Sequence, residues 1–433
     1  MSLRRAVVLV LAVTVWGIGA VAVAETLEEA WRRAMENDQA LAAVASETEA
    51  TRADERAARA ARCPVIQASA GYTRLGTAPA LDVSGQGLSF RSPPIFDEDD
   101  FVSSAAQVRL PLYAGGQISA GIAAARSNRI AAEATEQSSR AALKLDVARA
   151  YVGVLRVRRA LEAAESSVAS LAAHVADVEQ MVERELVPRA DLLAARVAFA
   201  NAEHARVRAA NDLQIAHAAY NRRLGEPLDR SVDLDERIPT DPTLARQPVE
   251  ALIERALASR SELQAMAAQA DALASQAEAQ LAALRPRIEL TGGYNYFENE
   301  ILDREDFSMV GVGVTWNLFD GGQARNRAAA LRHAGRAAQL RLNDLRSMIE
   351  LEVRQAWLDV KAARARIDAS CEAVAQAEEN LRTARELYSV DLGTNTQVLE
   401  AISLRTAAVT NRDNAVLDEA LAQLQLARAV GAL

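Results

Sequence analysis

Few side chains in this 433-residue sequence have the types and spacing that chemistry requires. The four histidines lie far apart, and no pair has the spacing of metal ligands or of a base beside a nucleophile. The two cysteines are too few for a disulfide framework. These residues are His174, His204, His217, His333, Cys63 and Cys371. The sequence therefore predicts no catalytic site, no metal site and no cofactor, and so a protein that is not an enzyme.

Two glycine pairs could be mistaken for phosphate-binding loops. They are Gly115 with Gly116 and Gly321 with Gly322, and neither belongs to the G-x-x-x-x-G-K-S/T pattern that cradles phosphates. Each pair lies between a strand pattern and a long helical pattern. Because glycine accepts backbone conformations that other residues avoid, we expect the pairs to form the bend from strand into helix.

Acidic residues exceed basic ones, 58 to 49. This excess argues against nucleic acid or anionic lipid as the main partner. Two acidic clusters stand out, at 97–100 and at 298–306. Clustered carboxylates can bind calcium, but solvated acidic loops are the simpler expectation here.

The first 24 residues have the pattern of a signal peptide. Arg4 and Arg5 precede an apolar stretch that ends in Ala22-Val-Ala24, a small-residue cleavage site. The stretch is also about long enough to span a bilayer, so an uncleaved anchor is the alternative. We expect residues 1–24 to be removed and the mature chain to begin at Glu25.

The rest of the sequence contains two copies of one unit. Residues 63–72 match 285–294, and residues 108–225 match 314–431 without a gap. We therefore divide the mature chain into a first repeat at 25–225, a linker rich in Pro and Asp at 226–248, and a second repeat at 249–433.

Each repeat shows two strand patterns of roughly ten residues. Apolar and polar residues alternate along them, most clearly at 287–297 and 308–319 and more weakly at 65–73 and 105–114. One apolar face with aromatic residues and one polar or small face are typical of a membrane barrel wall. A soluble sandwich sheet alternates in the same way and stays open as an alternative.

Helical patterns fill the remainder of each repeat. We predict helices at 27–62, 117–186 and 189–224, and the same in the second repeat. A seven-residue apolar repeat runs through the long helices, which predicts left-handed coiled-coil packing. The positions are Val147, Val154, Leu161, Val168, Val175 and Val182, then Val353, Val360, Ile367, Val374, Leu381 and Tyr388. Each repeat should form a hairpin of long helices that buries its apolar seams against other helices.

The strands require more than one chain. Two strands in each repeat give four per chain, too few to close a barrel, and open strand edges are not tolerated in lipid. If the strands lie in a membrane, several chains must therefore pool them.

The sequence resembles the TolC-like outer-membrane efflux proteins. The resemblance rests on the tandem repeat, the Pro-x-Ile…Gly-Tyr strand openings at 64–72 and 286–294, the junctions at 112–117 and 318–323, and the turn signatures at 186–193 and 392–401. It implies a mainly α protein with a small membrane β-barrel. Three chains would pool their strands into a 12-stranded barrel in the bacterial outer membrane and their helices into an α-helical barrel in the periplasm.

The resemblance also implies functional residues at the turns between paired helices. Carboxylates there would narrow the pore at the periplasmic tip: Glu400 matches one usual acid, Gln397 stands where the other often is, and Asp191 is its counterpart in the first repeat. A periplasmic adaptor protein would contact the same turns. The matching positions are Leu186, Val187, Leu392, Gly393 and Thr394.

The predicted function is a passive exit duct that serves an efflux or type I secretion system. An inner-membrane pump, proton-driven or ATP-driven, would supply the energy, and the tip would open when adaptor and pump engage it. The alternative is a structural or adhesive coiled-coil protein of the envelope with its strands in a soluble sheet.

Overall fold

The computed structural model describes residues 24–76, 80–85, 88–94, 100–299 and 303–433. They form two compact units, each drawn from both halves of the sequence. Within the described ranges, the tip unit comprises 24–36, Val147–Pro239 and Glu379–Thr410, and the sheet unit comprises the described parts of Asn37–Asp146, Thr240–Glu378 and Asn411–Leu433. The predicted signal peptide lies outside the described residues except for Ala24.

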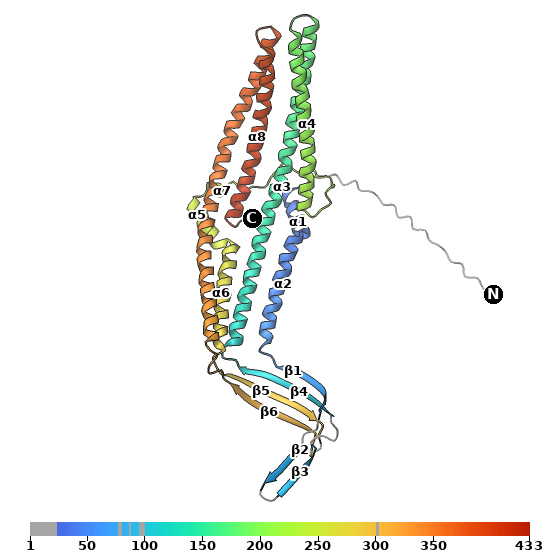
Figure 1. Cartoon of the computed structure of the whole chain (residues 1–433). Helices are drawn as coiled ribbons and strands as arrows, with labels where there is room; N and C mark the ends of the chain where they lie inside the picture. Colours follow the sequence, from blue (N-terminus) through green and yellow to red (C-terminus); the bar gives the residue numbers. More distant parts are fainter. Residues whose placement is uncertain (1–23, 77–79, 86–87, 95–99, 300–302) are drawn as a thin grey trace, which may run out of the picture. The chain divides into compact units, whose positions relative to one another are not determined.

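Helices make up most of the chain (Figure 1). They are α1 (Leu27–Asn37), α2 (Gln39–Ala60), α3 (Gln117–Glu183), α4 (Arg189–Arg223), the short 3₁₀ helix η1 (Leu244–Arg246), α5 (Val249–Ser259), α6 (Ser261–Ala282), α7 (Gln323–Ser389) and α8 (Asn395–Ala429). The predicted helices at 117–186 and 189–224 correspond to α3 and α4. Within the described ranges, no helix is both long and apolar enough to cross a membrane.

The predicted single helix at 27–62 is two helices. The break falls at Asp38, whose backbone is extended and whose Oδ1 accepts a hydrogen bond from the Leu41 amide at 2.7 Å. A carboxylate in this position satisfies one of the free amides at the start of α2. The second half of the sequence breaks at the corresponding place, Arg260, between α5 and α6. In each half, one residue with an extended backbone thus separates a short helix from a longer one, and only the first of the two, Asp38, caps the following helix with its side chain.

The heptad positions of the long helices are buried or half-buried. Val147, Val154, Val353 and Val360 have almost no exposed surface. The remaining positions of that repeat are buried or intermediate. The apolar repeat therefore marks the faces on which these helices pack, as the coiled-coil pattern predicts.

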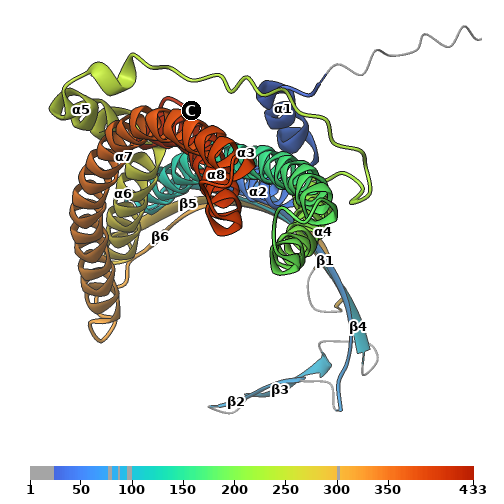
Figure 2. The same ribbon diagram turned by 90° about the horizontal axis from the view of Figure 1, so that it is seen from above.

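Four antiparallel strands form the main sheet, in the order β1-β4-β5-β6. They are β1 (Val65–Arg74), β4 (Asp100–Tyr113), β5 (Arg287–Phe297) and β6 (Asp306–Thr315). Pairing of β4 with β5 joins the strands of the two halves. Figure 2 shows these strands as a curved band. The longer first loop is not wholly irregular, because β2 (Ala80–Gly85) and β3 (Leu88–Pro94) form a second hairpin within it.

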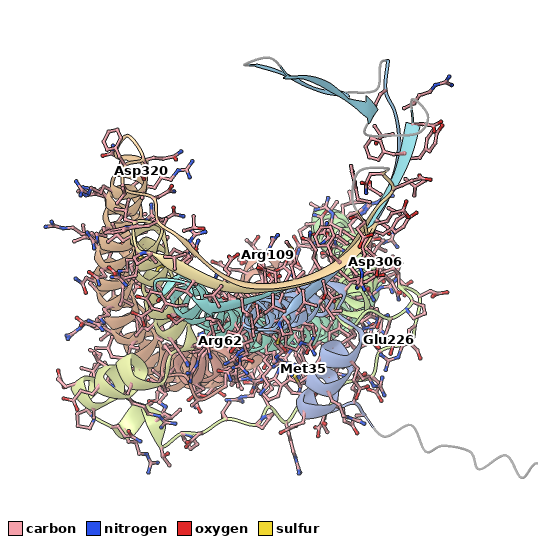
Figure 3. The ribbon with its side chains drawn as sticks, turned by 90° about the horizontal axis from the view of Figure 1, so that it is seen from below. Met35, Arg62, Arg109, Glu226, Asp306 and Asp320 are labelled. Atoms are coloured by element: carbon pink, nitrogen blue, oxygen red, sulfur yellow. The ribbon has the colours of Figure 1, made fainter. Side chains whose placement is uncertain are left out.

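The strand register gives the main sheet one apolar and one polar face. On the apolar face, Ile66 lies opposite Val108, and Leu290 lies opposite Leu110 and Val312. On the polar face, Arg109 lies beside Thr291, with its Nε 3.9 Å from Glu289. Figure 3 shows Arg109 on the concave side of the curved sheet. The polar face is therefore concave and the apolar face convex.

Buried ion pairs tie helices together in the sheet unit. Arg260 is buried and donates hydrogen bonds to Glu352 Oε2 and the Ala429 carbonyl, both at 3.0 Å. Arg428 donates to Glu262 Oε1 at 2.5 Å. Burial works to raise the pKa of Glu262, but hydrogen bonds from Arg260 and Arg428 outweigh it and lower that pKa to about 2. The start of α6 is thus fixed to α7 and α8.

In the tip unit, the predicted start of the mature chain is anchored. Glu25 is buried, and its carboxylate accepts a hydrogen bond from Arg230 at 2.8 Å. Its carbonyl accepts one from the Tyr151 hydroxyl at 2.8 Å. Burial, reinforced by nearby Asp235 and Glu25, raises the pKa of Tyr151. These contacts attach both the chain start and the segment after α4 to α3.

Candidate functional site: the helical turns and the polar face of the sheet

The turns that end the two helical hairpins have matching backbones. Residues 184–188 join α3 to α4, and residues 390–394 join α7 to α8. Each turn has one non-glycine residue with positive φ, Glu185 at 64° and Asp391 at 56°. These positions are equivalent in the two repeats. Asp391, and not the nearby Gly393, therefore supplies the left-handed conformation of the second turn.

Gly393 is required by a close approach. A Cβ at this position would lie 3.0 Å from the Tyr388 amide nitrogen and 3.1 Å from the Leu387 Cβ. The Gly393 amide itself donates to the Leu387 carbonyl at 3.1 Å. The turn thus folds tightly back on the end of α7, which leaves little room for a side chain.

A buried polar network joins all four helices next to the turns. The His174 Nε2 of α3 lies 2.7 Å from the Asn395 Oδ1 of α8, and both residues are buried. The Asn395 Nδ2 donates to the Asp191 carbonyl of α4 at 3.0 Å. The Tyr388 hydroxyl of α7 donates to the Asp191 Oδ2 at 3.3 Å. We call these four residues the tip network.

Because the Asn395 Nδ2 donates, its Oδ1 must accept, so the His174 Nε2 carries the proton of that bond. The His174 and Tyr388 rings lie in contact, with centroids 5.6 Å apart. Burial, together with the nearby Asp191 carboxylate, raises the pKa of Tyr388 to about 12. Tyr388 is therefore a neutral donor at physiological pH.

Apolar side chains from the same helices surround the tip network. Their buried members are Leu171, Val178, Leu192, Leu381, Val398, Ala401 and Ile402, together with Tyr388. Low polarity around a hydrogen bond strengthens it and makes an unpaired group costly. The network and this cluster therefore hold the two hairpins together near their ends.

The three predicted gate residues have different surroundings. Asp191 belongs to the tip network. Gln397 caps its own helix, since its Oε1 accepts from the Thr394 amide at 2.9 Å and its amide donates to the Thr394 Oγ1 at 3.3 Å. Glu400 lies one turn further along α8 and is exposed. Of these three residues, only Glu400 is a carboxylate at an exposed position.

The predicted adaptor-contact residues include large exposed side chains. Leu186 is 62% exposed and Leu392 is 77% exposed, and Thr394 is also exposed. Val187 and Gly393 are half-buried. Leucine side chains this exposed in a turn mark a surface on which a partner protein can pack. They occupy equivalent positions in the two turns.

Sequence reasoning missed His174, Asn395 and the role of Tyr388. In the sequence, Tyr388 stands at a heptad position, and the four histidines lie far apart with no shared motif. A signal was present, because His174 is three residues after Leu171 and four before Val178, both on a buried seam. A polar residue on an apolar helical face indicates a partner across the interface.

The glycine pairs lie between strand and helix, and all four glycines have positive φ. The values are 61° and 91° at Gly115 and Gly116, and 67° and 85° at Gly321 and Gly322. The Gly115 carbonyl accepts from Arg285 Nη1 at 2.9 Å. In the second junction, Asp320 (Figure 3) accepts from the Gly322 and Ala324 amides. These hydrogen bonds from backbone amides lower the pKa of Asp320.

The acidic loop residues fall only partly within the described ranges. Residues 97–99 and 300 lie outside them. Asp100 begins β4 and accepts from the Tyr72 hydroxyl, and Glu298 accepts from the Val102 amide at 2.7 Å. Across the described residues, no group of three or more His, Cys, Asp or Glu side chains could hold a metal ion. The described carboxylates thus serve the ends of the strands.

Comparison with known proteins places this geometry in a family. The sequence profile of the outer membrane efflux protein family matches residues 30–226 and 252–432. The chain is 27% identical over 421 residues to the outer membrane protein TolC of Vibrio cholerae, covering 95% of this chain and 91% of TolC. It is 22% identical over 388 residues to the outer membrane efflux protein BepC of Brucella suis, covering 88% and 80% of the two chains.

The fold agrees with solved structures. The outer membrane protein VceC of Vibrio cholerae superposes with a TM-score of 0.80 at 20% identity, covering 94% of this chain and 96% of VceC. The predicted fold class, mainly α with a small barrel-forming sheet, is confirmed. So are the predicted exit duct, its place in the bacterial outer membrane with a periplasmic helical tunnel, and the absence of enzymatic function. The chain belongs to the outer membrane efflux protein family.

Proposed function

We propose that three copies of this chain form one exit duct whose periplasmic tip is held closed by the tip network. In this duct, residues 1–24 are removed on export and the tandem repeats at 25–225 and 249–433 make near-equivalent parts of the wall. A periplasmic adaptor and an inner-membrane pump open the tip, and cargo leaves through the barrel. The duct itself supplies no energy.

The sheet supports the pooling of several chains. Within the described residues, β1 and β6 each pair on one side only, so each has a free edge. The convex face carries exposed apolar residues, including Ile66, Val310 and Val312. A free edge beside an apolar face is untenable in lipid unless another strand covers it. Pairing β6 of one copy with β1 of the next removes both edges.

The tip network is the observation that carries the gate. It is polar, buried and shared by α3, α4, α7 and α8. Its hydrogen bonds are broken when α7 and α8 move away from α3 and α4, because each bond joins one hairpin to the other. A network with few members can be opened by a partner that binds the exposed turns, since the net free energy of each bond is about 1 kcal/mol.

The two exposed leucines support the place of the adaptor. Leu186 and Leu392 recur at equivalent positions, so a ring of three chains would present six such side chains. An apolar anchor surrounded by polar residues is typical of a protein contact. An adaptor that gains this contact only in the open arrangement would shift the tip towards opening.

Planar-bilayer conductance tests the gate. Tyr388→Phe removes the hydroxyl that binds Asp191 and keeps the ring against His174. We expect purified wild-type channels to conduct weakly and the variant several-fold more strongly, because one bond of the closed state is lost.

The matched control is Ser389→Ala, which removes a hydroxyl from the neighbouring residue of α7 without touching the tip network. Ser389 is exposed and its hydroxyl bonds only within α7, to the Glu386 carbonyl. We expect this control to conduct like the wild type. Equal conductance of Tyr388→Phe and wild type would remove the tip network from the gate.

A further inference from the structure

The concave face of the main sheet carries almost no charge. The residues of β1, β4, β5 and β6 that share this face are small, amide, hydroxyl or apolar side chains, with three exceptions. Arg109, Arg287 and Glu289 are the only charged residues on this face within the described parts of the four strands. Two positive charges against one negative charge leave the face with an excess of positive charge.

All three charged residues lie at the strand ends next to the helices. Arg287 is the first residue of β5, Glu289 is two residues further on, and Arg109 lies near the end of β4. The register places Glu289 opposite Pro111 and Arg109 opposite Thr291. Glu289 and Arg109 are therefore diagonal neighbours, and the three side chains form one cluster on the concave side, where Figure 3 shows Arg109.

The one carboxylate of the cluster leaves most of the arginine charge unbalanced. Arg109 Nε lies 3.9 Å from Glu289 Oε2, and the two side chains are 59% and 43% exposed. An ion pair this long and this exposed is weak. Arg287 forms no ion pair with any described residue. Because a guanidinium group has five N–H donors, both arginines keep donors for a ligand.

A third arginine is fixed at the same end of the sheet. Arg285 Nη1 donates to the Gly115 carbonyl at 2.9 Å, which holds the guanidinium group beside the junction of β4 and α3. The approach requires glycine, because a Cβ on Gly115 would lie 2.7 Å from the Arg285 Cβ. A carbonyl oxygen accepts a hydrogen bond without neutralising the charge. Arg285 therefore adds a further positive charge to the cluster.

The acid that follows β6 is committed elsewhere. The Asp320 carboxylate accepts hydrogen bonds from the Gly322 and Ala324 amides, at 2.9 Å and 2.8 Å. At this position its charge is stabilised by the first turn of α7, where the helix dipole is positive. Asp320 thus serves the start of a helix, whereas the arginines have no acid of their own.

We propose that Arg109, Arg287 and Arg285 form a binding site for carboxylate, phosphate or sulfonate groups of dissolved anions, repeated in each copy as a ring at the base of the barrel. The proposal rests on the proposed duct, in which the concave face lines the lumen. Guanidinium groups bind two oxygens of such anions at once. Rings of arginine in a pore attract anions, and low-dielectric walls strengthen their field.

Binding of a polyanion tests the site. Pyrenetetrasulfonate, a fluorescent molecule with four sulfonate groups, is titrated against the full chain in phosphatidylcholine nanodiscs and followed by anisotropy, with empty nanodiscs subtracted. We expect saturable binding that weakens as salt is added. Arg109→Gln should raise Kd about fourfold, and its combination with Arg287→Gln at least about tenfold, since charge-assisted hydrogen bonds are lost. Pyrophosphate, an anion without rings, should compete at constant ionic strength.

Two further variants separate this site from general charge and from misfolding. The matched control is Arg74→Gln, which removes an exposed arginine from the apolar face at the far end of β1. We expect it to bind like the wild type. Glu289→Gln removes the one carboxylate of the cluster and should lower Kd about threefold. A variant that fails to fold cannot bind more tightly.

Unchanged Kd in the double variant would overturn the site, and so would an equal loss in Arg74→Gln or a Glu289→Gln variant that binds no more tightly than the wild type. Ion conduction by the same preparations reports on the duct separately. Channels that conduct but bind the polyanion equally with and without the arginines overturn only the site. Preparations that bind it through the arginines but never conduct, even with Tyr388→Phe, overturn the duct and leave the anion site.

Discussion

The two helical turns share one backbone and differ in what their side chains do. They align with an offset of 206 residues, and Glu185 and Asp391 occupy the same left-handed position. At the start of the following helix, the first turn has Pro188 without a side-chain cap, whereas the second has Thr394 and Gln397 capping each other. The fold of the turn thus does not depend on one capping chemistry.

The larger difference lies in the residues that reach across to the other hairpin. Asn395 bonds to His174 and Asp191, whereas its equivalent, Arg189, is exposed. Tyr388 bonds to Asp191, whereas its equivalent, Val182, is apolar. Conversely, Asp191 accepts two bonds from the second hairpin, whereas its equivalent, Gln397, turns back on its own helix. The duplicated turns have become complementary: the second supplies Tyr388 and Asn395, which reach across, and the first supplies Asp191, which accepts from both.

The largest expected effect comes from removing Asn395. Asn395→Leu keeps the volume and leaves the His174 donor and the Asp191 carbonyl unpaired, which should cost about 2 kcal/mol. Hydrogen exchange of the amides in the two turns should become about 30-fold faster. Arg189→Leu, at the equivalent exposed position, should leave these rates unchanged. If both variants accelerate exchange equally, the two turns are not complementary in this sense.

A smaller effect is expected from the helix caps. Thr394→Ala removes the hydroxyl that accepts from the Gln397 amide and should destabilise the start of α8 by about 1 kcal/mol. Pro188→Ala should change the start of α4 by only a few tenths, because Pro188 supplies no side-chain bond there. Exchange rates at Gln397 and at Asp191 measure the two effects. Equal losses would show that the cap of the second turn contributes nothing specific.

The smallest effect concerns ion selectivity. Glu400→Gln removes a carboxylate from an exposed face of α8 and should lower the cation-to-anion permeability ratio by about twofold, measured from reversal potentials in a salt gradient. Glu183→Gln, an exposed acid at the end of α3, is the control in the other hairpin. A ratio that stays the same for Glu400→Gln, or that falls equally for Glu183→Gln, would remove the special role of Glu400.

Much of the fold was accessible from the sequence because it depends on periodic patterns. The seven-residue repeat located α3 and α7, and the alternation at 287–297 and 308–319 located β5 and β6 with their faces in the right sense. The break at Asp38 was missed because one capping residue outweighed an uninterrupted helical pattern. The hairpin of β2 and β3 was missed because its strands are short and lie in a loop that has no counterpart in the second repeat.

The candidate site was accessible only in part. Position in the turn motif indicated Asp191, Gln397 and Glu400, but nothing local distinguishes an acid that bonds across an interface from one that faces solvent. His174 is 221 residues from Asn395, and Glu289 is in the opposite half of the chain from Arg109. No spacing rule connects residues so far apart.

The sequence by itself determined the periodic features of this protein: the duplicated unit, the heptad seams and the two-faced strands. Each follows from local geometry, since 3.6-residue and two-residue periods translate directly into faces. Only the tertiary structure decided which equivalent residues of the duplicated turns meet, and which of them cap, bond or remain exposed. Those choices depend on side chains brought together by the packing of α3, α4, α7 and α8, and packing is set by the whole surface of each helix rather than by any single motif.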